Sequence, residues 1–271
     1  MTRATLREVL GPGHAVAGFV CLGWEDARAY TAAAEAEGAP VILQAGPGAR
    51  AHMPISVWGE MFRTLAEGAC VPVVTHLDHG DSYETCAEAI AAGFSSVMFD
   101  GSSLPLEENI ARTARIAEMA RAAGVSCEGE IGFVGYAEGA ASTGTDPDEA
   151  ARFARETGVD AMAVSVGNLH LQQTAGAALD EARLRAIRAR CDVAMVIHGG
   201  SGVPTGQRRA LAAEGLVAKY NIGTELRQTF GAALRAELTR HPDQFDRIEI
   251  LRATERPLTE ACREIIRALR P

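Results

Sequence analysis

Short apolar runs alternate with longer amphipathic stretches along the whole chain. The runs are rich in Val and Ile, which favours β-strands, and they cover residues 14–21, 40–46, 71–79, 96–101, 125–132, 159–167, 192–200 and 217–225. The stretches between them are rich in Ala, Arg, Leu and Glu, which favour helices, and they cover 24–37, 55–68, 82–92, 106–123, 148–157, 179–189, 205–213 and 225–239. The pattern therefore predicts eight strands, each followed by a helix.

Residues at the ends of the predicted helices support these boundaries. Asp81 and Ser82 can cap the third helix, and Asp146-Pro147 opens the fifth. Glycines follow several helices, where a left-handed residue is needed: Gly38, Gly93, Gly124, Gly158 and Gly215.

Strands separated by helices pair in parallel through right-handed crossovers. Closing eight such units gives an α/β fold, a (β/α)₈ TIM barrel, with its active-site loops at the carboxyl ends of the strands. We expect the barrel over about 14–240 and a short C-terminal helical extension over about 242–268, within a single catalytic domain of residues 1–271. An open doubly wound sheet is the alternative, which the lack of a GxGxxG motif after the first strand weakens.

Composition narrows the class of protein. The chain is 47% hydrophobic but only 5% aromatic, so we expect a large core of Ala, Val, Ile and Leu. A net charge of −9 argues against nucleic-acid binding. The absence of an apolar run of about 18 residues argues against a membrane span, and the polar N-terminus against a signal peptide. The six scattered cysteines form no CxxC pair, which predicts buried reduced thiols and a cytoplasmic protein.

Polar residues collect where the predicted strands end, and these ends meet at one mouth of a barrel. They are His76, Asp78, His79, Asp100, Glu128, Glu130, Asn168, His170, His198, Asn221, Thr224 and Glu225. Three imidazoles from different strands, those of His79, His170 and His198, can meet around one divalent ion, and Zn²⁺ is the first candidate. Glu130 or Asp100 could complete the set of ligands or hold an alternate metal position.

Other polar residues suggest supporting roles. His76 shares a strand face with Asp78, and we expect it to orient the metal-binding residues. Asp78 itself is either an acid/base group or a helix cap. Glu138 lies in the Gly-rich stretch 133–145 and is either part of a loop that closes over substrate or a solvated charge. The remaining histidines are expected to be structural or on the surface: His14, His52 and His241.

Two Gly-containing segments, 198–202 and 221–225, are suited to binding an anion. Flexible backbone lets several N–H groups converge, a helix follows each segment, and barrels often bind phosphate after strands seven and eight. Tight turns are the alternative reading. The candidate residues are Gly199, Gly200, Ser201, Asn221, Gly223 and Thr224.

Several long segments resemble one known family, the metal-dependent (class II) fructose-1,6-bisphosphate and tagatose-1,6-bisphosphate aldolases. The segments are PVILQAGPGA, THLDHGDSYETCAEAIAAGFSSVMFDGSSLPLEENI, EGEIG, DPDEAARFARETGVDAMAVSVGNLH, VIHGGSGVP and KYNIGTELR. The resemblance extends over nearly the whole chain, and these motifs are specific when they occur together in this order.

The resemblance implies a role for individual residues. The family's zinc ligands are matched by His79, His170 and His198. Glu130 and Asp100 match acidic residues associated with alternate or second metal positions. Asp78 matches the Asp that exchanges a proton with the oxygen at the cleaved bond, and Glu138 matches the mobile-loop Glu that moves the proton next to the ketone. Gly199, Ser201, Asn221 and Thr224 match the substrate and phosphate-binding segments.

The resemblance also implies an activity and partners. It implies an aldehyde-lyase of carbohydrate metabolism that cleaves a ketose or sugar phosphate reversibly through a zinc-stabilised enediolate. No Schiff-base lysine is needed; the chain has few lysines, and Lys219, at a strand end, matches the metal-dependent pattern. The family implies a homodimer or homotetramer and, near the phosphate, a monovalent cation. Co²⁺, Mn²⁺ and Fe²⁺ stay open as native metals.

Three departures from the family pattern lie on the substrate side. Leu171 follows the strand-six histidine where the family usually has Gly, Val20 stands where it usually has Asn, and the second strand ends in GPGA without the serine of some members. We therefore expect a substrate other than fructose 1,6-bisphosphate. The alternatives are a metal-dependent sugar-phosphate isomerase or epimerase, or a non-catalytic sugar-binding relative.

Overall fold

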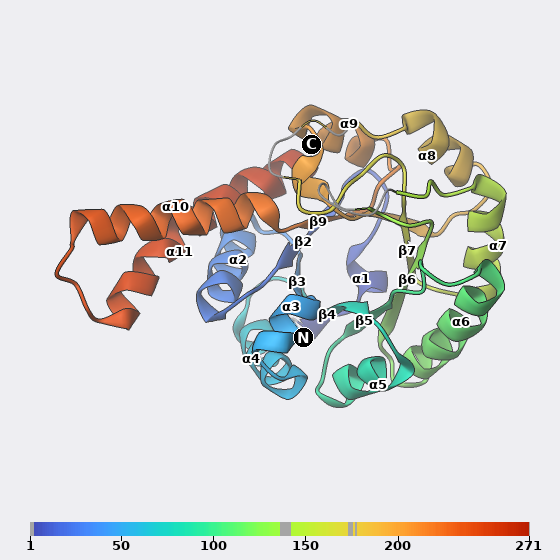
Figure 1. The fold of residues 1–271 in the computed structure, drawn as a ribbon. Helices are drawn as coiled ribbons and strands as arrows, with labels where there is room; N and C mark the ends of the chain where they lie inside the picture. The colour runs from blue at the N-terminus through green and yellow to red at the C-terminus, as the bar shows by residue number, and fades with distance from the viewer. Residues whose placement is uncertain (1–2, 136–141, 173–175, 177, 271) are drawn as a thin grey trace.

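Eight parallel strands close into a barrel in the computed structural model, which describes residues 3–135, 142–172, 176 and 178–270 (Figure 1). The barrel strands are β2 (Val16–Val20), β3 (Val41–Ala45), β4 (Val73–Gly80), β5 (Ser96–Phe99), β6 (Ser126–Ile131), β7 (Ala161–Val164), β8 (Ala194–Ile197) and β9 (Lys219–Ile222). Closure is complete because β4 pairs with both β3 and β5. The TIM barrel is therefore confirmed, and the open sheet is excluded.

Helices follow the strands as the sequence predicts. They are α2 (Trp24–Glu37), α4 (Ile55–Gly68), α5 (Tyr83–Ala91), α6 (Leu106–Ala122), α7 (Pro147–Thr157), α8 (Glu181–Arg188), α9 (Thr205–Ala213) and α10 (Thr224–Arg240). The Ser82 hydroxyl accepts from the Thr85 N–H, and the Asp146 carboxylate accepts from two N–H groups of α7, so these two predicted caps are confirmed, whereas Asp81 accepts only from the Thr85 hydroxyl. All five predicted glycines after helices have positive φ.

Short elements were not predicted, because a few residues show no periodicity. They are β1 (Arg3–Ala4), α1 (Leu6–Val9), α3 (Pro47–His52) and the 3₁₀ turn η1 (Gly200–Gly202). β1 pairs with the first residues of β4. Leu6 and Val9 of α1 pack with Val16 and Ile42, so that β1 and α1 close the amino-terminal end of the barrel with apolar side chains.

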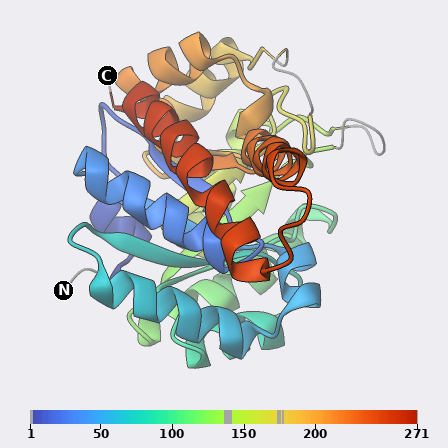
Figure 2. The ribbon, with the colours of Figure 1, turned by 90° about the vertical axis from the view of Figure 1, so that its left-hand side faces the viewer.

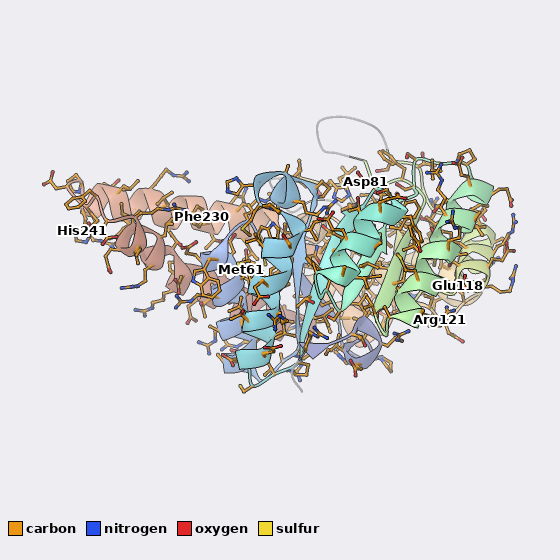
Figure 3. The ribbon with its side chains drawn as sticks, turned by 90° about the horizontal axis from the view of Figure 1, so that it is seen from below. Met61, Asp81, Glu118, Arg121, Phe230 and His241 are labelled. Carbon is orange, nitrogen blue, oxygen red and sulfur yellow. The ribbon has the colours of Figure 1, made fainter. Side chains whose placement is uncertain are left out.

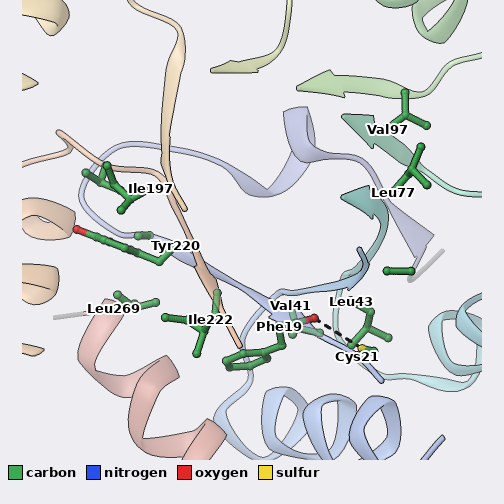
Figure 4. Close-up of a cluster of buried hydrophobic side chains, with 14 of the residues drawn as sticks. Phe19, Cys21, Val41, Leu43, Leu77, Val97, Ile197, Tyr220, Ile222 and Leu269 are labelled. Carbon is green, nitrogen blue, oxygen red and sulfur yellow. Dashed lines mark hydrogen bonds between the residues drawn. The ribbon is translucent and has the colours of Figure 1, made fainter. Parts of the chain in front are cut away.

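Side chains alternate between the inside of the barrel and the surrounding helices. On β9, Tyr220 and Ile222 face outward into the apolar layer that Figure 4 shows, whereas Lys219 and Asn221 contact groups inside the barrel. The core is largely aliphatic, as expected, with some aromatic contacts such as Trp58–Phe62, whose ring centroids lie 5.3 Å apart. The polar interior of the barrel and its apolar outer layer therefore both follow from the alternation of side chains along each strand.

The C-terminal extension is a single long helix, α11 (Arg247–Leu269). It lies along α2 (Figure 2) and forms with α10 an arm that leaves the barrel, with His241 at its far end (Figure 3). Apolar side chains near this end are exposed, above all Phe245 (93%) and Ile248 (64%).

The cysteines largely follow the prediction. Cys21, Cys86, Cys127 and Cys262 are buried free thiols, and Cys191 is half-buried. Cys70 is exposed, so the prediction of burial was wrong there, because this residue lies in the turn between α4 and β4. Across the described ranges, no helix is both long and apolar enough to cross a membrane.

We predict that the packing of α1 against the amino-terminal end of the barrel contributes strongly to stability. Leu6→Ala should lower the free energy of unfolding by about 2–5 kcal/mol, because Leu6 is fully buried and its loss leaves a cavity. Val57→Ala on the exposed face of α4 is the control and should change it by less than about 0.5 kcal/mol. Denaturant titration followed by circular dichroism measures both. Equal losses of stability in the two variants would contradict this role of α1.

Candidate metal centre and active site

A cavity of about 600 Å³ lies at the carboxyl ends of the strands. Most of the predicted site residues line it: Asp78, His79, Asp100, His170, Gly199, Ser201, Asn221, Gly223 and Thr224. His198, Glu130 and Gly200 are buried and do not line it. His14, His52 and His241 do not line it, as expected. Barrel enzymes hold their active sites at this end.

Three predicted histidines meet beside this cavity: His79 and His170 line it, and His198 is buried against them. Each of His79, His170 and His198 offers a ring nitrogen, and these atoms all lie within 4.8 Å of one another. A second group, His79, Asp100 and Glu130, meets the same distance limit and shares His79 with the first. The chain thus brings together a three-imidazole group and, beside it, an acidic position that could hold an ion in an alternate place.

Two buried polar atoms at this site lack hydrogen bonds. His198 Nδ1 and Glu130 Oε2 approach to 3.2 Å, but they are not aligned for a hydrogen bond, and neither has a hydrogen-bond partner elsewhere in the described chain. Leaving such atoms unsatisfied in the interior is costly. A cation between them would satisfy both, so this donor set fits a divalent metal.

The charged groups around His198 favour its protonated form. Burial disfavours the imidazolium, but Glu130 and Glu128 outweigh burial and raise the pKa of His198 to about 10. Burial, together with the neighbouring His198 and His79, lowers the pKa of His170 to about 3. A bound cation would take the place of the proton on His198 and neutralise the same carboxylates.

His79 occupies an irregular point on β4. The register of β4 against β5 shifts between Leu77 and Gly80, and His79 has a left-handed φ of 50°. Its Nδ1 lies 2.8 Å from Asp100 Oδ2, and Asp100 also accepts from the hydroxyl and backbone N–H of Ser102. The bulge turns the imidazole toward the cavity, and the carboxylate fixes its orientation.

Arg50 holds this bulge from α3. Its guanidinium donates to the carbonyl oxygens of Ala45 (3.0 Å), Asp78 (2.5 Å) and His79 (2.9 Å). A strained residue persists only where its surroundings fix it, and Arg50 supplies that restraint. Arg50 could not be predicted from the sequence, because nothing distinguishes it among the chain's many arginines.

Asp78 lines the cavity and is held there by a hydrogen bond. Its Oδ1 accepts from the Asn221 amide at 3.0 Å. Burial alone would raise the pKa of Asp78, but His79, His198 and Lys219 outweigh it and lower the pKa below its usual value. Asp78 is therefore ionised near neutral pH and can accept a proton at the cavity. His76 lies on the same face of β4, as predicted. Its ring contacts Glu128 and not one of the three clustered histidines.

Backbone conformation explains two positions in the loops. Gly199 has a φ of 67°, and a Cβ there would lie 2.0 Å from the Leu169 carbonyl oxygen, so only glycine fits. Leu171 also has a positive φ, 56°, although it carries a side chain that is 52% exposed at the cavity. Glycine adopts this conformation without strain, so Leu171 is a costly choice on the substrate side.

The predicted phosphate segments converge at the start of α10. The Ser201 hydroxyl oxygen accepts from the N–H groups of Gly223 (3.2 Å) and Glu225 (3.3 Å). Thr224 begins the helix, and Arg227 also lines the cavity there. The amino terminus of a helix, next to the positive charge of an arginine, is suited to binding an anion. Arg227 was not predicted, for the same reason as Arg50.

Glu138, the predicted proton carrier, lies outside the residues that the structure describes. It remains a prediction. Ser142, in the described part of the same stretch, accepts from the Gly135 N–H.

Known proteins are similar to this chain in amino-acid sequence. The profile of the family described as Fructose-bisphosphate aldolase class-II matches residues 1–271. The chain is 38% identical over 253 residues to a fructose-bisphosphate aldolase of Geobacillus stearothermophilus, covering 91% of this chain and 88% of that protein. It is 37% identical to a 6-phospho-5-dehydro-2-deoxy-D-gluconate aldolase of Halalkalibacterium halodurans, covering 98% and 94%.

A solved structure is similar over the same length. The crystal structure of the YdjI aldolase from Escherichia coli K12 matches with a TM-score of 0.82 and 31% sequence identity, covering 95% of this chain and 92% of that one.

We predict that Arg50 stabilises the β4 bulge and the metal group. Arg50→Met should lower the free energy of unfolding by about 2 kcal/mol or more, because charged hydrogen bonds to three carbonyls are lost, and should weaken Zn²⁺ binding. Arg63→Met, which removes a surface ion pair on α4, should cost less than about 1 kcal/mol. Denaturant titration measures the stability of both variants, and metal titration measures their Zn²⁺ affinity. Equal losses in the two variants would show that Arg50 does not stabilise the bulge.

Proposed function

The chain belongs to the class-II fructose-bisphosphate aldolase family and is a lyase, and we propose that it cleaves a ketose phosphate other than fructose 1,6-bisphosphate, using a divalent ion. The observation that carries the proposal is the meeting of the three imidazoles of His79, His170 and His198 at a cavity that His79 and His170 line.

We assign the metal to this group of histidines, with Zn²⁺ as the expected ion. Imidazole nitrogens suit Zn²⁺, and a catalytic site leaves a position open for substrate. Glu130 and Asp100 would serve an alternate position, reached through the shared His79. When bound, the ion would act as a Lewis acid that spreads the negative charge left by carbon–carbon cleavage.

The chain's own residues handle the proton. Ionised Asp78 would accept the proton of the hydroxyl at the bond that breaks, while the Asn221 amide holds the carboxylate in place. Asn221 Oδ1 is buried without a hydrogen-bond partner among the described residues and could accept from a substrate hydroxyl. Glu138 is proposed to move the proton on the carbon beside the ketone, which the family resemblance alone supports.

The phosphate end of the substrate is proposed to bind at the start of α10. The supporting residues are Gly199, Gly200, Ser201, Asn221, Gly223 and Thr224, of which Gly200 acts by letting the turn pass close to β9. A monovalent cation near this phosphate is proposed from the family resemblance.

Two residues support a substrate that differs from fructose 1,6-bisphosphate. Leu171 and Val20 are apolar and line the cavity where the family usually has Gly and Asn. The relatives named above include both a fructose-bisphosphate aldolase and a 6-phospho-5-dehydro-2-deoxy-D-gluconate aldolase, so chains similar to this one act on different substrates. An isomerase, an epimerase or a non-catalytic sugar-binding protein is not favoured, since these relatives are aldolases.

We also propose a cytoplasmic homodimer or homotetramer. The free buried thiols suit a reducing compartment. The exposed Phe245 and Ile248 on the arm are the kind of apolar surface that a subunit interface covers.

The proposed reaction predicts cleavage that depends on metal. Ketose monophosphates, ketose bisphosphates and free ketoses are offered to the purified protein, and triose products are detected by a coupled assay. We expect cleavage of at least one substrate other than fructose 1,6-bisphosphate, loss of cleavage with chelator, and recovery with Zn²⁺. Asp78→Asn should lower kcat by about 10²–10⁴-fold and still bind metal. Isomerised product without carbon–carbon cleavage would refute the aldolase reaction.

Leu171 is predicted to set both local strain and substrate choice. Leu171→Gly should raise the free energy of unfolding by up to about 1 kcal/mol, because glycine tolerates the positive φ, and should raise kcat/KM for fructose 1,6-bisphosphate relative to the native substrate. Leu171→Ala is the matched control: it removes the side chain but keeps the strain. If neither variant alters the substrate ratio, Leu171 does not determine specificity.

A further inference from the structure

Lys219 is the only lysine in the chain, since all its other basic side chains besides histidine are arginines. It lies on β9 in the centre of the barrel, with none of its surface exposed. A buried ammonium is costly unless it is paired and hydrogen-bonded. Retaining one at this position therefore calls for a specific partner.

Lys219 is joined to a row of equally buried polar groups. Its Nζ donates to Glu128 Oε2 at 2.7 Å and lies 3.4 Å from His76 Nε2. Glu128 Oε1 lies 3.1 Å from His198 Nε2, and His76 Nδ1 lies 2.7 Å from Ser96 Oγ. We call these five residues the barrel-centre network: Ser96, His76, Lys219, Glu128 and His198.

The ammonium, which can only donate, and the carboxylate of Glu128, which can only accept, together set the direction of the hydrogen bonds in this network. His76 Nε2 must accept from it, so the His76 proton lies on Nδ1 and is donated to Ser96. Glu128 is held through one oxygen by Lys219 and accepts through the other from His198 Nε2–H. When a cation takes the place of the second proton, the lone pair of His198 is on Nδ1, the atom that faces Glu130 and the candidate metal position.

The network acts below the cavity and not within it. Lys219, Glu128 and His76 do not line the cavity, so the Lys219 amine is not placed to attack a substrate carbonyl. Space around Lys219 is also restricted: a Cβ on Gly18 would lie 3.0 Å from Lys219 Cε. The compact ammonium on an unbranched stem fits here, whereas a planar guanidinium is larger.

We propose that Lys219 is a positioning residue for the metal: acting through Glu128, it holds the His198 ring with Nδ1 directed at the ion. The proposal rests on the metal centre proposed above. It assigns to a residue that touches neither metal nor substrate the task of setting metal affinity, in the way that outer partners orient metal-binding histidines.

The test compares metal affinity in Lys219→Met, which keeps the length of the stem, with affinity in the wild-type protein. The Zn²⁺ dissociation constant is measured by competition with a chromogenic chelator, and the visible absorption of bound Co²⁺ reports the geometry of the ligands. We expect Lys219→Met to raise the dissociation constant by about 10–100-fold and to change the Co²⁺ spectrum. Tyr220→Phe, at the next position on β9 but facing outward, is the control and should change neither.

Glu128→Gln, of equal size, separates positioning from general damage. If Lys219 acts through Glu128, adding Lys219→Met to Glu128→Gln should change the dissociation constant little, since the two effects are not additive for groups in one chain of contacts. Thermal unfolding of the metal-free variants checks that each is folded. If Lys219→Met does not fold, Glu128→Gln alone must show the loss of affinity.

The outcomes are distinct. Wild-type affinity and an unchanged Co²⁺ spectrum in Lys219→Met, or in Glu128→Gln where it replaces Lys219→Met, would overturn the role of Lys219 and leave the metal centre standing. Fully additive losses in the double variant would show that Lys219 does not act through Glu128 and would also overturn it. Failure of the wild-type protein to bind Zn²⁺ or Co²⁺ would overturn the metal centre and this inference together.

Discussion

The placement of His198 between two buried carboxylates is the interaction on which the site depends. Glu128 lies on one side of its ring at 3.1 Å and Glu130 on the other at 3.2 Å. Two carboxylates beside one ring are stable in the interior only if positive charge balances them. Lys219 balances Glu128 from below, and the candidate metal position lies beside Glu130. The charge of the ion and the charge of the lysine are therefore parts of one arrangement.

The barrel separates three tasks along its axis. Apolar side chains of β1 and α1 close the amino-terminal end, polar groups without solvent access fill the centre, and the cavity opens at the carboxyl end. A change at the closed end should act on stability, whereas a change in the centre should act on the geometry of the site. This separation allows the loops to vary, as in barrels generally, without disturbing the residues that would hold the ion.

Strain occurs at two residues of the site, with different apparent purposes. The positive φ of His79 is held by Arg50 and turns the ring toward the other imidazoles. Leu171 adopts its positive φ with an exposed side chain at the cavity, on the side where a substrate would lie. The first strain would serve the proposed metal centre, and the second places an apolar side chain at the cavity. The metal side of the site thus follows the family pattern, while the substrate side departs from it.

Periodicity, glycine positions and the order of motifs determined the barrel, its helices and the family, because these features are local and repeat along the chain. The sequence also placed His79, His170 and His198 at strand ends, and closure of the sheet then brought them together. Only the tertiary structure revealed Arg50 on the β4 bulge and Lys219 within the barrel-centre network. Their roles depend on contacts between residues far apart in the chain, and neither residue type nor spacing encodes such contacts in a form that can be read from the sequence.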